Sequence, residues 1–474
     1  MSTMNPSRLP MYATSRLRFS AAALAVSFAL GGCAVGPSYQ TPSTPAPAQF
    51  KEAQGWVPAA PADTLERGPW WTLFNDPLLN DLAAQVDVSN QNVAAAVASY
   101  AQARALVQQQ RASLFPTVSL STSGDRSGGK DTSSESSYRL NIGASWEPDL
   151  WGRLRAGVGS ARAGEQASAA DLASARLSAQ GELAVNYFSL RQSDAQRALL
   201  ATTIEGYERV AQITQNRFDA GITAKSDVLQ AQTQLANARI DDLSLARQRA
   251  QLENAIAILI GKAPADFRLA AAPWTAAIPE IPVGVPSLLL QRRPDIAAAE
   301  RRVAAANEQI GIARSAYYPN IGLSGGLGSA GSRVSDLFSA STALWSFGVS
   351  ATQTLFNAGA TRANVAGAEA QQQVAAARYR QTVLDAFGDV ENQLAATRVL
   401  AQQQVLRKQA SEAADQVEAQ MLNRYKAGQV SYTEVVQVQA TALSARRALV
   451  QAQADRQTTA VALIQSLGGG WQAQ

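Results

Sequence analysis

The sequence predicts a mainly α-helical protein that is built from two internal repeats, with two β-strands in each repeat. Two pairs of segments, about 203 to 207 residues apart, match in the same order, which indicates the repeat. Long runs rich in Ala, Gln and Arg carry apolar residues every three or four positions, as in helices that pack along their length. Two stretches alternate clearly between apolar and polar residues and two more do so faintly, as in strands with one apolar face.

Residues 1–32 are expected to be a signal peptide. Arg16 and Arg18 precede the apolar run 19–30, which at about 12 residues is too short for a transmembrane helix of ~20. The run leads into "LGGC", which resembles the lipobox of bacterial lipoproteins and contains the single cysteine of the chain, Cys33. We therefore expect cleavage before Cys33 and a covalent lipid on it, with an ordinary signal peptide as the alternative.

Residues 33–68 are expected to form an acylated N-terminal tether. The segment after Cys33 is rich in Pro, Ser and Thr, a composition typical of extended linkers. An Asp after the cysteine favours retention at the inner membrane in the lipoprotein pathway, so Ala34 favours the outer membrane. The rest of the sequence has no stretch of ~18 continuous apolar residues, so we expect no helical membrane span.

The first repeat is expected to cover residues 69–262. Its opening helix, at about 77–114, should end before Pro116, because proline disfavours helix in the residue ahead of it. Strands are expected at about 117–124 and 137–147, joined by a loop rich in Ser and Gly.

Each repeat then continues into a helix of unusual length. The helices expected at about 153–217 and 360–425 would each be almost 100 Å long at ~1.5 Å per residue. Gly221 and Gly428 supply the backbone freedom for a turn at the end of each long helix, and a returning helix follows each turn.

A crossover at 263–290 separates the first repeat from the second, which is expected to cover residues 291–470. The prolines of the crossover exclude a regular helix. In the second repeat, Pro294 suits the first position of a helix, and strands are expected at about 320–328 and 344–355.

The strands indicate a barrel that several chains share. The apolar face that we expect to contact lipid comprises Tyr138, Leu140, Ile142, Trp146, Trp345 and Phe347. At roughly 8 to 11 residues, each strand is long enough to cross a bilayer. Four strands cannot close a barrel, for which about eight are needed, and open edges are not tolerated in lipid. A trimer would supply twelve strands; the alternative is an ordinary four-stranded sheet packed on helices in a soluble protein.

The composition argues against several classes of function. Charged residues make up 16% of the chain and the net charge is +4, too little for an ordinary nucleic-acid surface. The chain has no His and one Cys, which removes the commonest general base and excludes an intramolecular disulfide or a thiolate metal cluster. No phosphate-binding Gly motif is present. We therefore expect no enzyme, no catalytic residues, no metal and no cofactor other than the lipid on Cys33.

Several motifs resemble one family of bacterial proteins. The segments "PWWTLFNDPLLNDL" (69–82) and "QRRPDIAAAERRVAAANEQIGIARSAYYPNIGLSG" (291–325), with the paired turns "NRFDAG" and "NRYKAG", resemble the efflux lipoproteins of the TolC-like outer membrane factor family. The resemblance covers nearly the whole mature chain. It implies a homotrimer with a twelve-stranded barrel in the outer membrane and a long antiparallel α-helical barrel in the periplasm. It also implies a periplasmic adaptor (membrane fusion) protein and an inner-membrane pump, often of the resistance-nodulation-division class.

The resemblance places a periplasmic gate near the two glycine turns. Asp227 matches an acid that accepts a hydrogen bond from a tyrosine, which is Tyr425 in this chain. Glu434 and Gln437 match a pair of acids that ring the constriction in some members, so this chain keeps one acid of the two. A basic residue expected near Val430 is missing. The alternative for both acids is that they stabilise the N-terminal ends of helices.

The residues around the turns are also expected to contact the adaptor. These residues are Arg217, Gly221, Arg424 and Gly428. The alternative is that the two arginines belong to a solvated surface.

The resemblance thus implies the outer-membrane channel of a tripartite efflux pump, a passive exit duct for drugs or other small molecules. The expected location is the cell outer membrane, lipid-anchored and extending into the periplasm. One alternative is the duct of a type I protein secretion system, and another is a pore-free structural coiled-coil lipoprotein of the periplasm.

Overall fold

A computed structural model describes residues 35–44, 47, 49–52, 69–130, 132–274, 276–279, 281 and 292–469. The expected signal peptide and Cys33 lie outside these residues, as do most of the tether and part of the crossover. Within the described residues, no helix combines the length and apolar character needed to cross a membrane. The same residues contain no group of three or more His, Cys, Asp or Glu side chains that could hold a metal ion.

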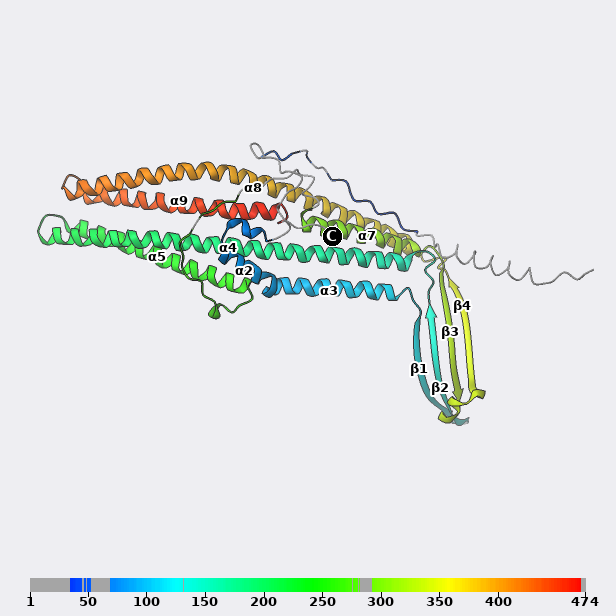
Figure 1. Ribbon diagram of the computed structural model, residues 1–474. Helices are drawn as coiled ribbons and strands as arrows, with labels where there is room; N and C mark the ends of the chain where they lie inside the picture. Colours follow the sequence, from blue (N-terminus) through cyan, green and yellow to red (C-terminus); the bar gives the residue numbers. More distant parts are fainter. Residues whose placement is uncertain are drawn as a thin grey trace, which may run out of the picture. The chain divides into compact units, whose positions relative to one another are not determined.

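The chain is mainly helical and repeats one order of elements (Figure 1). The elements of the first half are η1 (Trp70–Phe74), α2 (Pro77–Ser89), α3 (Gln91–Ala112), β1 (Thr117–Gly129), β2 (Thr132–Trp146), α4 (Arg153–Asp219), α5 (Lys225–Leu259) and η2 (Pro264–Asp266). The elements of the second half are α7 (Pro294–Ser315), β3 (Asn320–Gly331), η3 (Val334–Phe338), η4 (Ala340–Thr342), β4 (Ala343–Thr352), α8 (Ala360–Lys426) and α9 (Tyr432–Ser466). The long helices α4 and α8 have 67 residues each, as expected for helices of ~100 Å.

The single helix expected at 77–114 is instead two helices, α2 and α3, and Asn90 causes the break. The Asn90 side-chain oxygen accepts hydrogen bonds from the backbone N–H groups of Asn92 and Val93, at 3.0 and 3.1 Å, and so caps the start of α3. Its amide nitrogen donates to the carbonyl of Leu259 at 2.8 Å. The sequence pattern hides this break because apolar residues continue on both sides of Asn90.

The chain divides into two compact units. The first unit comprises residues 1–42, 101–167 and 299–379, and it contains the sheet. The second unit comprises residues 43–100, 168–298 and 380–474, and it contains both glycine turns.

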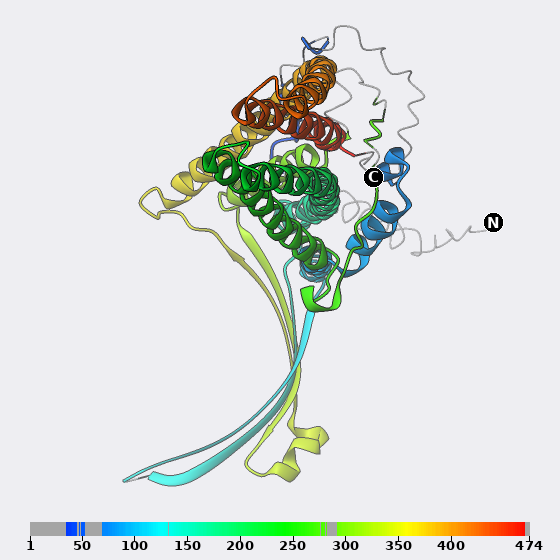
Figure 2. The same cartoon turned by 90° about the vertical axis from the view of Figure 1, so that its left-hand side faces the viewer.

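The sheet of the first unit has the order β1-β2-β3-β4, and all its neighbouring strands are antiparallel (Figures 1 and 2). The register aligns apolar residues across all four strands: Leu120, Ile142, Leu327 and Trp345 form one such row. Directly paired residues point to the same side of a sheet. The alternation seen in separate parts of the sequence therefore becomes one continuous apolar face.

The opposite face of the sheet is polar and small. One of its rows consists of Ser119, Gly143, Gly326 and Ser346. Arg139 and Asn141 lie on the same side as this row, and the residues paired with them are serine, glycine and alanine.

The strands differ in extent from those expected at 117–124, 137–147, 320–328 and 344–355. The β1–β2 ladder continues to the pair Gly129–Thr132, and β3 extends to Gly331. These added residues are mostly Gly, Ser and Thr, so apolar and polar side chains do not alternate along them. The strands nevertheless continue, because pairing through backbone hydrogen bonds does not require such alternation.

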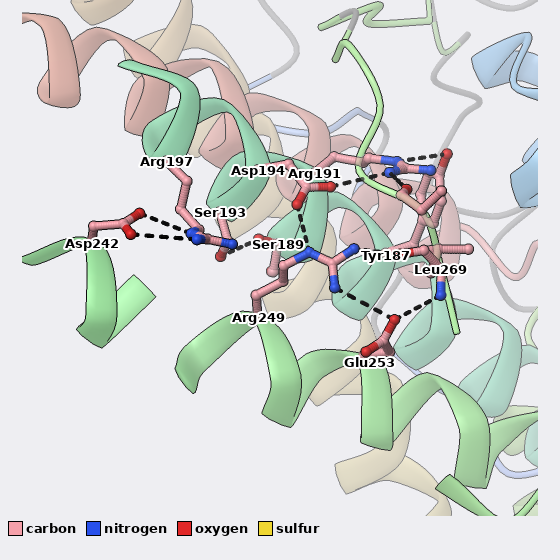
Figure 3. A network of polar contacts seen from close by, with 11 residues as sticks. Tyr187, Ser189, Arg191, Ser193, Asp194, Arg197, Asp242, Arg249, Glu253 and Leu269 are labelled. Atoms are coloured by element: carbon pink, nitrogen blue, oxygen red, sulfur yellow. Dashed lines mark hydrogen bonds and ion pairs between the residues drawn. The ribbon is translucent and has the colours of Figure 1, made fainter. Parts of the chain in front are cut away.

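A buried polar network in the second unit fixes the start of the crossover against α4 and α5 (Figure 3). Asp194 on α4 is 5% exposed and forms ion pairs with Arg191, at 3.1 Å, and with Arg249 of α5, at 2.6 Å. Arg191 also donates to the carbonyl of Ala270 at 2.9 Å, and the backbone N–H of Leu269 donates to Glu253. Buried charges are stable only when paired and hydrogen-bonded, and this condition is met here.

Candidate functional site

The two glycine turns have the same backbone geometry. Gly221 and Gly428 have φ values of 73° and 71°, in the left-handed region that favours glycine. In each turn an N–H bonds back across the end of the helix, from Ile222 to the carbonyl of Arg217 at 2.8 Å and from Gln429 to that of Arg424 at 2.9 Å. Each long helix therefore ends in the same tight reversal.

The helix ends next to the turns meet in one buried cluster. It consists of Val210, Ala231, Tyr425, Tyr432 and Val435, which come from α4, α5, α8 and α9. The cluster therefore joins the ends of two hairpins that lie about two hundred residues apart in the sequence.

Two tyrosines occupy this cluster. Tyr425 and Tyr432 are 5% and 3% exposed, and their ring centroids are 5.5 Å apart. Burial raises the pKa of Tyr432, and the neighbouring Tyr425 raises it further. Tyr432 was not predicted as a site residue; its signal in the sequence is an aromatic residue seven positions after Tyr425, across the turn.

Arg217 binds Tyr425 from the other repeat. Its guanidinium carbon lies 5.0 Å from the centroid of the Tyr425 ring, and its Nη1 donates to the Tyr425 carbonyl at 3.4 Å. The Tyr425 hydroxyl lies 3.5 Å from Oγ1 of Thr214. Arg217 is thus engaged within the chain, and its contact with an adaptor stays a prediction.

Within the described residues of the single chain, Asp227 and Tyr425 have other partners, and the hydrogen bond between them that the resemblance implied stays a prediction. The Asp227 carboxylate accepts hydrogen bonds from the hydroxyl groups of Thr223 and Ser226, at the first turn of α5. The Tyr425 ring packs against Tyr432, and the Tyr425 hydroxyl lies next to Oγ1 of Thr214.

The other expected gate residues lie at the surface of the single chain. Glu434, Gln437 and Arg424 are exposed, and Glu434 accepts a hydrogen bond from the Ser431 hydroxyl at 3.1 Å. The resemblance implied a basic residue near position 430. Val430 occupies this position, and it packs against the buried tyrosine cluster. The structure thus places an apolar contact where a charged one was expected.

Two polar contacts connect α5 and α9 directly. Thr433 donates to Oε1 of Gln230 at 3.2 Å, and Arg447 forms an ion pair with Asp241 at 2.6 Å. Asp241 and Arg447 also line a cavity of about 310 Å³. The sequence offered no signal for these pairs, because each partner is a polar residue on a helix rich in polar residues.

The six residues expected to face lipid share one face of the sheet. Trp345 and Phe347 are 82% and 71% exposed in the single chain, whereas Tyr138 and Leu140 are half-buried. Trp146 lies at the end of this face next to the helices, and its indole N–H donates to the carbonyl of Leu114 at 3.0 Å. The geometry groups these side chains; their contact with lipid stays a prediction.

Known proteins resemble this chain along almost its whole length. The model of a family described as "Outer membrane efflux protein" matches residues 82–262 and 285–469. The probable efflux pump outer membrane protein TtgC of Pseudomonas putida is 32% identical over 460 residues, which cover 94% of this chain and 95% of that protein.

Two further similarities extend the comparison. The cation efflux system protein CusC of Escherichia coli is 30% identical over 456 residues, 94% of this chain and 98% of CusC. The solved structure of the outer-membrane channel OprN superimposes with a TM-score of 0.85 at 32% identity, covering 93% of this chain and 100% of OprN.

Proposed function

The chain belongs to the outer membrane efflux protein family and is the outer-membrane channel of a tripartite efflux pump, and we propose that it exports organic small molecules. The relatives at 32% identity support this choice of substrate, since their names refer to efflux of toluene, antibiotics and solvents. CusC, at 30% identity, is named for cation efflux, so cations are the second candidate.

The channel works as a homotrimer with a periplasmic adaptor and an inner-membrane pump. Four strands per chain give twelve in a trimer, enough to close a barrel without free edges. The apolar face of each sheet lies toward lipid, and the face with Arg139 and Asn141 lies toward water. The single observation that carries this arrangement is the register that aligns apolar residues on all four strands.

The end of the channel at the glycine turns is its closed end. The contacts that support this are Arg217 with Tyr425, Gln230 with Thr433, and Asp241 with Arg447, each of which joins the two repeats. Opening requires the two hairpins of a chain to separate, and these contacts would have to break. Transport itself is passive, and the inner-membrane pump supplies the energy.

A lipid on Cys33 anchors the chain to the outer membrane. The proposal is supported by the "LGGC" sequence and by the placement of the single cysteine immediately after the apolar run.

Sensitivity tests after deletion of the gene separate the two substrate classes. We expect greater sensitivity to toluene and to antibiotics, restored by the gene on a plasmid, with unchanged tolerance of metal salts. Loss of tolerance to the metal salts alone would instead support cation export.

A further inference from the structure

The outer loop comprises residues 332–342, between β3 and β4. The register of the sheet determines to which side the residues at the base of this loop point. Gly331 pairs with Tyr138, and Ser329 pairs with Leu140. Directly paired residues in antiparallel strands point to the same side. Gly331 and Ser329 therefore belong to the apolar face of the sheet, not to the face with Asn141.

The outer loop packs onto this apolar face. A Cβ added at Gly331 would lie 2.5 Å from Cβ of Asp336, so Asp336 fills the space that a side chain on this face would need. The Ser329 hydroxyl lies 2.7 Å from Oγ1 of Thr342, and this Oγ1 also donates to the Asp336 carbonyl at 2.5 Å. Two independent contacts thus hold the loop on the apolar side.

The loop carries two large apolar side chains that are exposed in the single chain. Phe338 is 82% exposed and Val334 is 56% exposed, both within the short helix η3, which lies beside the hairpin end of β3 in Figure 2. The Asp336 carboxylate accepts hydrogen bonds from the Arg333 N–H, at 3.1 Å, and from the Ser335 hydroxyl, so the backbone of η3 is fixed while Phe338 stays free.

The loop lies in the outer part of the apolar band. The face runs from Trp146, near the helices, to Tyr138, eight residues along β2 and about 26 Å at ~3.3 Å per residue. Strands of outer-membrane barrels are tilted by ~35–45°, so this length spans about 20 Å of an apolar band that is ~25 Å tall and has aromatic residues at both limits. Because Gly331 pairs with Tyr138, the loop lies level with Tyr138, in the outer part of this band.

We propose that the outer loop is a membrane anchor, with Phe338 and Val334 among the acyl chains of the outer leaflet, and not a lid over the channel. The proposal rests on the outward orientation of the apolar face given under the proposed function. Phe338 and Val334 continue that face beyond the strands. Because the loop is held on the side away from Asn141, it leaves the water-lined mouth of the channel uncovered.

Fluorescence quenching in vesicles tests the anchor. A Phe338→Cys chain labelled with an environment-sensitive thiol probe is reconstituted as the full trimer in phosphatidylcholine vesicles that contain lipids with a nitroxide near the headgroup. Matched Phe347→Cys and Asn141→Cys chains report the apolar and the polar face. The wild-type chain, with its one native cysteine, is treated identically and serves as the blank.

We expect nitroxide lipids to reduce the emission of the Phe338 probe at least as strongly as that of the Phe347 probe, and to leave the Asn141 probe unaffected. The second substitution Thr342→Val in the Phe338→Cys chain removes the contacts to Ser329 and Asp336. It should weaken the quenching of the probe at position 338 by nitroxide lipids.

Two results would overturn the anchor in distinguishable ways. Quenching of the Phe338 probe by aqueous iodide alone, with lipid quenching at position 347, would refute the anchor and leave the proposed function intact. Quenching by nitroxide lipids at position 141, and not at position 347, would show that the polar face contacts lipid. This result would refute both the orientation of the sheet given under the proposed function and the membrane anchor.

Discussion

At the residue scale, the repeats are joined near the glycine turns by contacts of different strength. Tyr425 is buried under Arg217, so separating this pair exposes an aromatic ring as well as breaking a cation–π contact. The ion pair of Asp241 with Arg447 is partly exposed, at 45% and 34% of the side chains, and exposed pairs contribute only ~1 kcal/mol or less. The tyrosine cluster therefore contributes more to closure than the ion pair.

The ion pair between Asp241 and Arg447 can be tested by exchanging its charges. Arg447→Asp places two carboxylates together and should raise the leak conductance of single channels in planar bilayers. A coupling of ~1 kcal/mol corresponds to about a fivefold change in the open population. Asp241→Arg should act alike, and the double exchange should return conductance toward the wild-type level. If the double exchange leaks as much as either single variant, the pair does not hold the repeats together.

The raised pKa of Tyr187 predicts that the protein loses stability at alkaline pH. Burial and its hydrogen bond to Asp76, at 2.6 Å, raise the pKa of Tyr187 to about 12, above the usual value of 10.0. The unfolded chain ionises first, so this contribution to the free energy of unfolding is complete below pH 10 and is lost as the pH rises to about 12.

Chemical unfolding at a series of pH values checks this prediction. Tyr187→Phe should lower stability at pH 8, because the Asp76 hydrogen bond is lost, yet should make the decline between pH 10 and 12 shallower by on the order of 2 kcal/mol. An identical alkaline decline in both proteins would show that Tyr187 does not titrate in this range.

At the element scale, the sheet shows how local patterns become a surface. Tyr138 to Trp146 alternate within one strand, but the apolar face depends on the register that pairs Ile142 with Leu120 and Leu327. A shift of one residue would turn a whole strand over and interrupt the face.

Two neighbouring substitutions in β2 test the assignment of the faces. Leu140→Asp puts a charge on the face proposed to meet lipid, where Arg or Lys costs ~2–4 kcal/mol at the bilayer midplane and Asp less, and it should block assembly of trimers in the outer membrane. Asn141→Asp lies on the polar face and should assemble normally. Heat-modifiable trimers on gels of outer-membrane fractions measure both, and equal assembly of the two variants would refute the assignment.

The exact bounds of the helices and strands are only partly predictable from sequence patterns. The long helices and the four strands were predicted from periodicity, and the two turns from the backbone freedom of Gly221 and Gly428. The break at Asn90 was not, because a cap depends on side-chain hydrogen bonds, including one to Leu259, far away in the sequence. The outer ends of the strands were not predicted either, because Gly and Ser pair by backbone bonds without an apolar pattern.

At the scale of the whole molecule, the single chain leaves surfaces that its own residues do not cover. Leu406 and Val417 on α8 are 63% and 46% exposed, although they lie on a helical stripe typical of packed helices. In a homotrimer such a stripe would face a neighbouring chain, just as the four-stranded sheet requires neighbours to close a barrel.

Removal of the proposed acylation site separates anchoring from assembly. Cys33→Ser should abolish incorporation of labelled palmitate while the strands still carry the trimer into the membrane, because the barrel is itself held by its apolar face. Labelling followed by membrane fractionation measures both. Undiminished lipid incorporation in Cys33→Ser would place the lipid on another residue.

The sequence by itself determined the repeats, the long helices, the turns at Gly221 and Gly428, and the alternation of the strands, because these follow from the spacing of residues along the chain. Only the tertiary structure decided which side chains meet across that spacing. It placed Tyr425 against Arg217 and Thr214, and it laid the outer loop on the apolar face of the sheet. The physical reason is that contacts between distant residues depend on packing and register, which periodicity along a single chain does not specify.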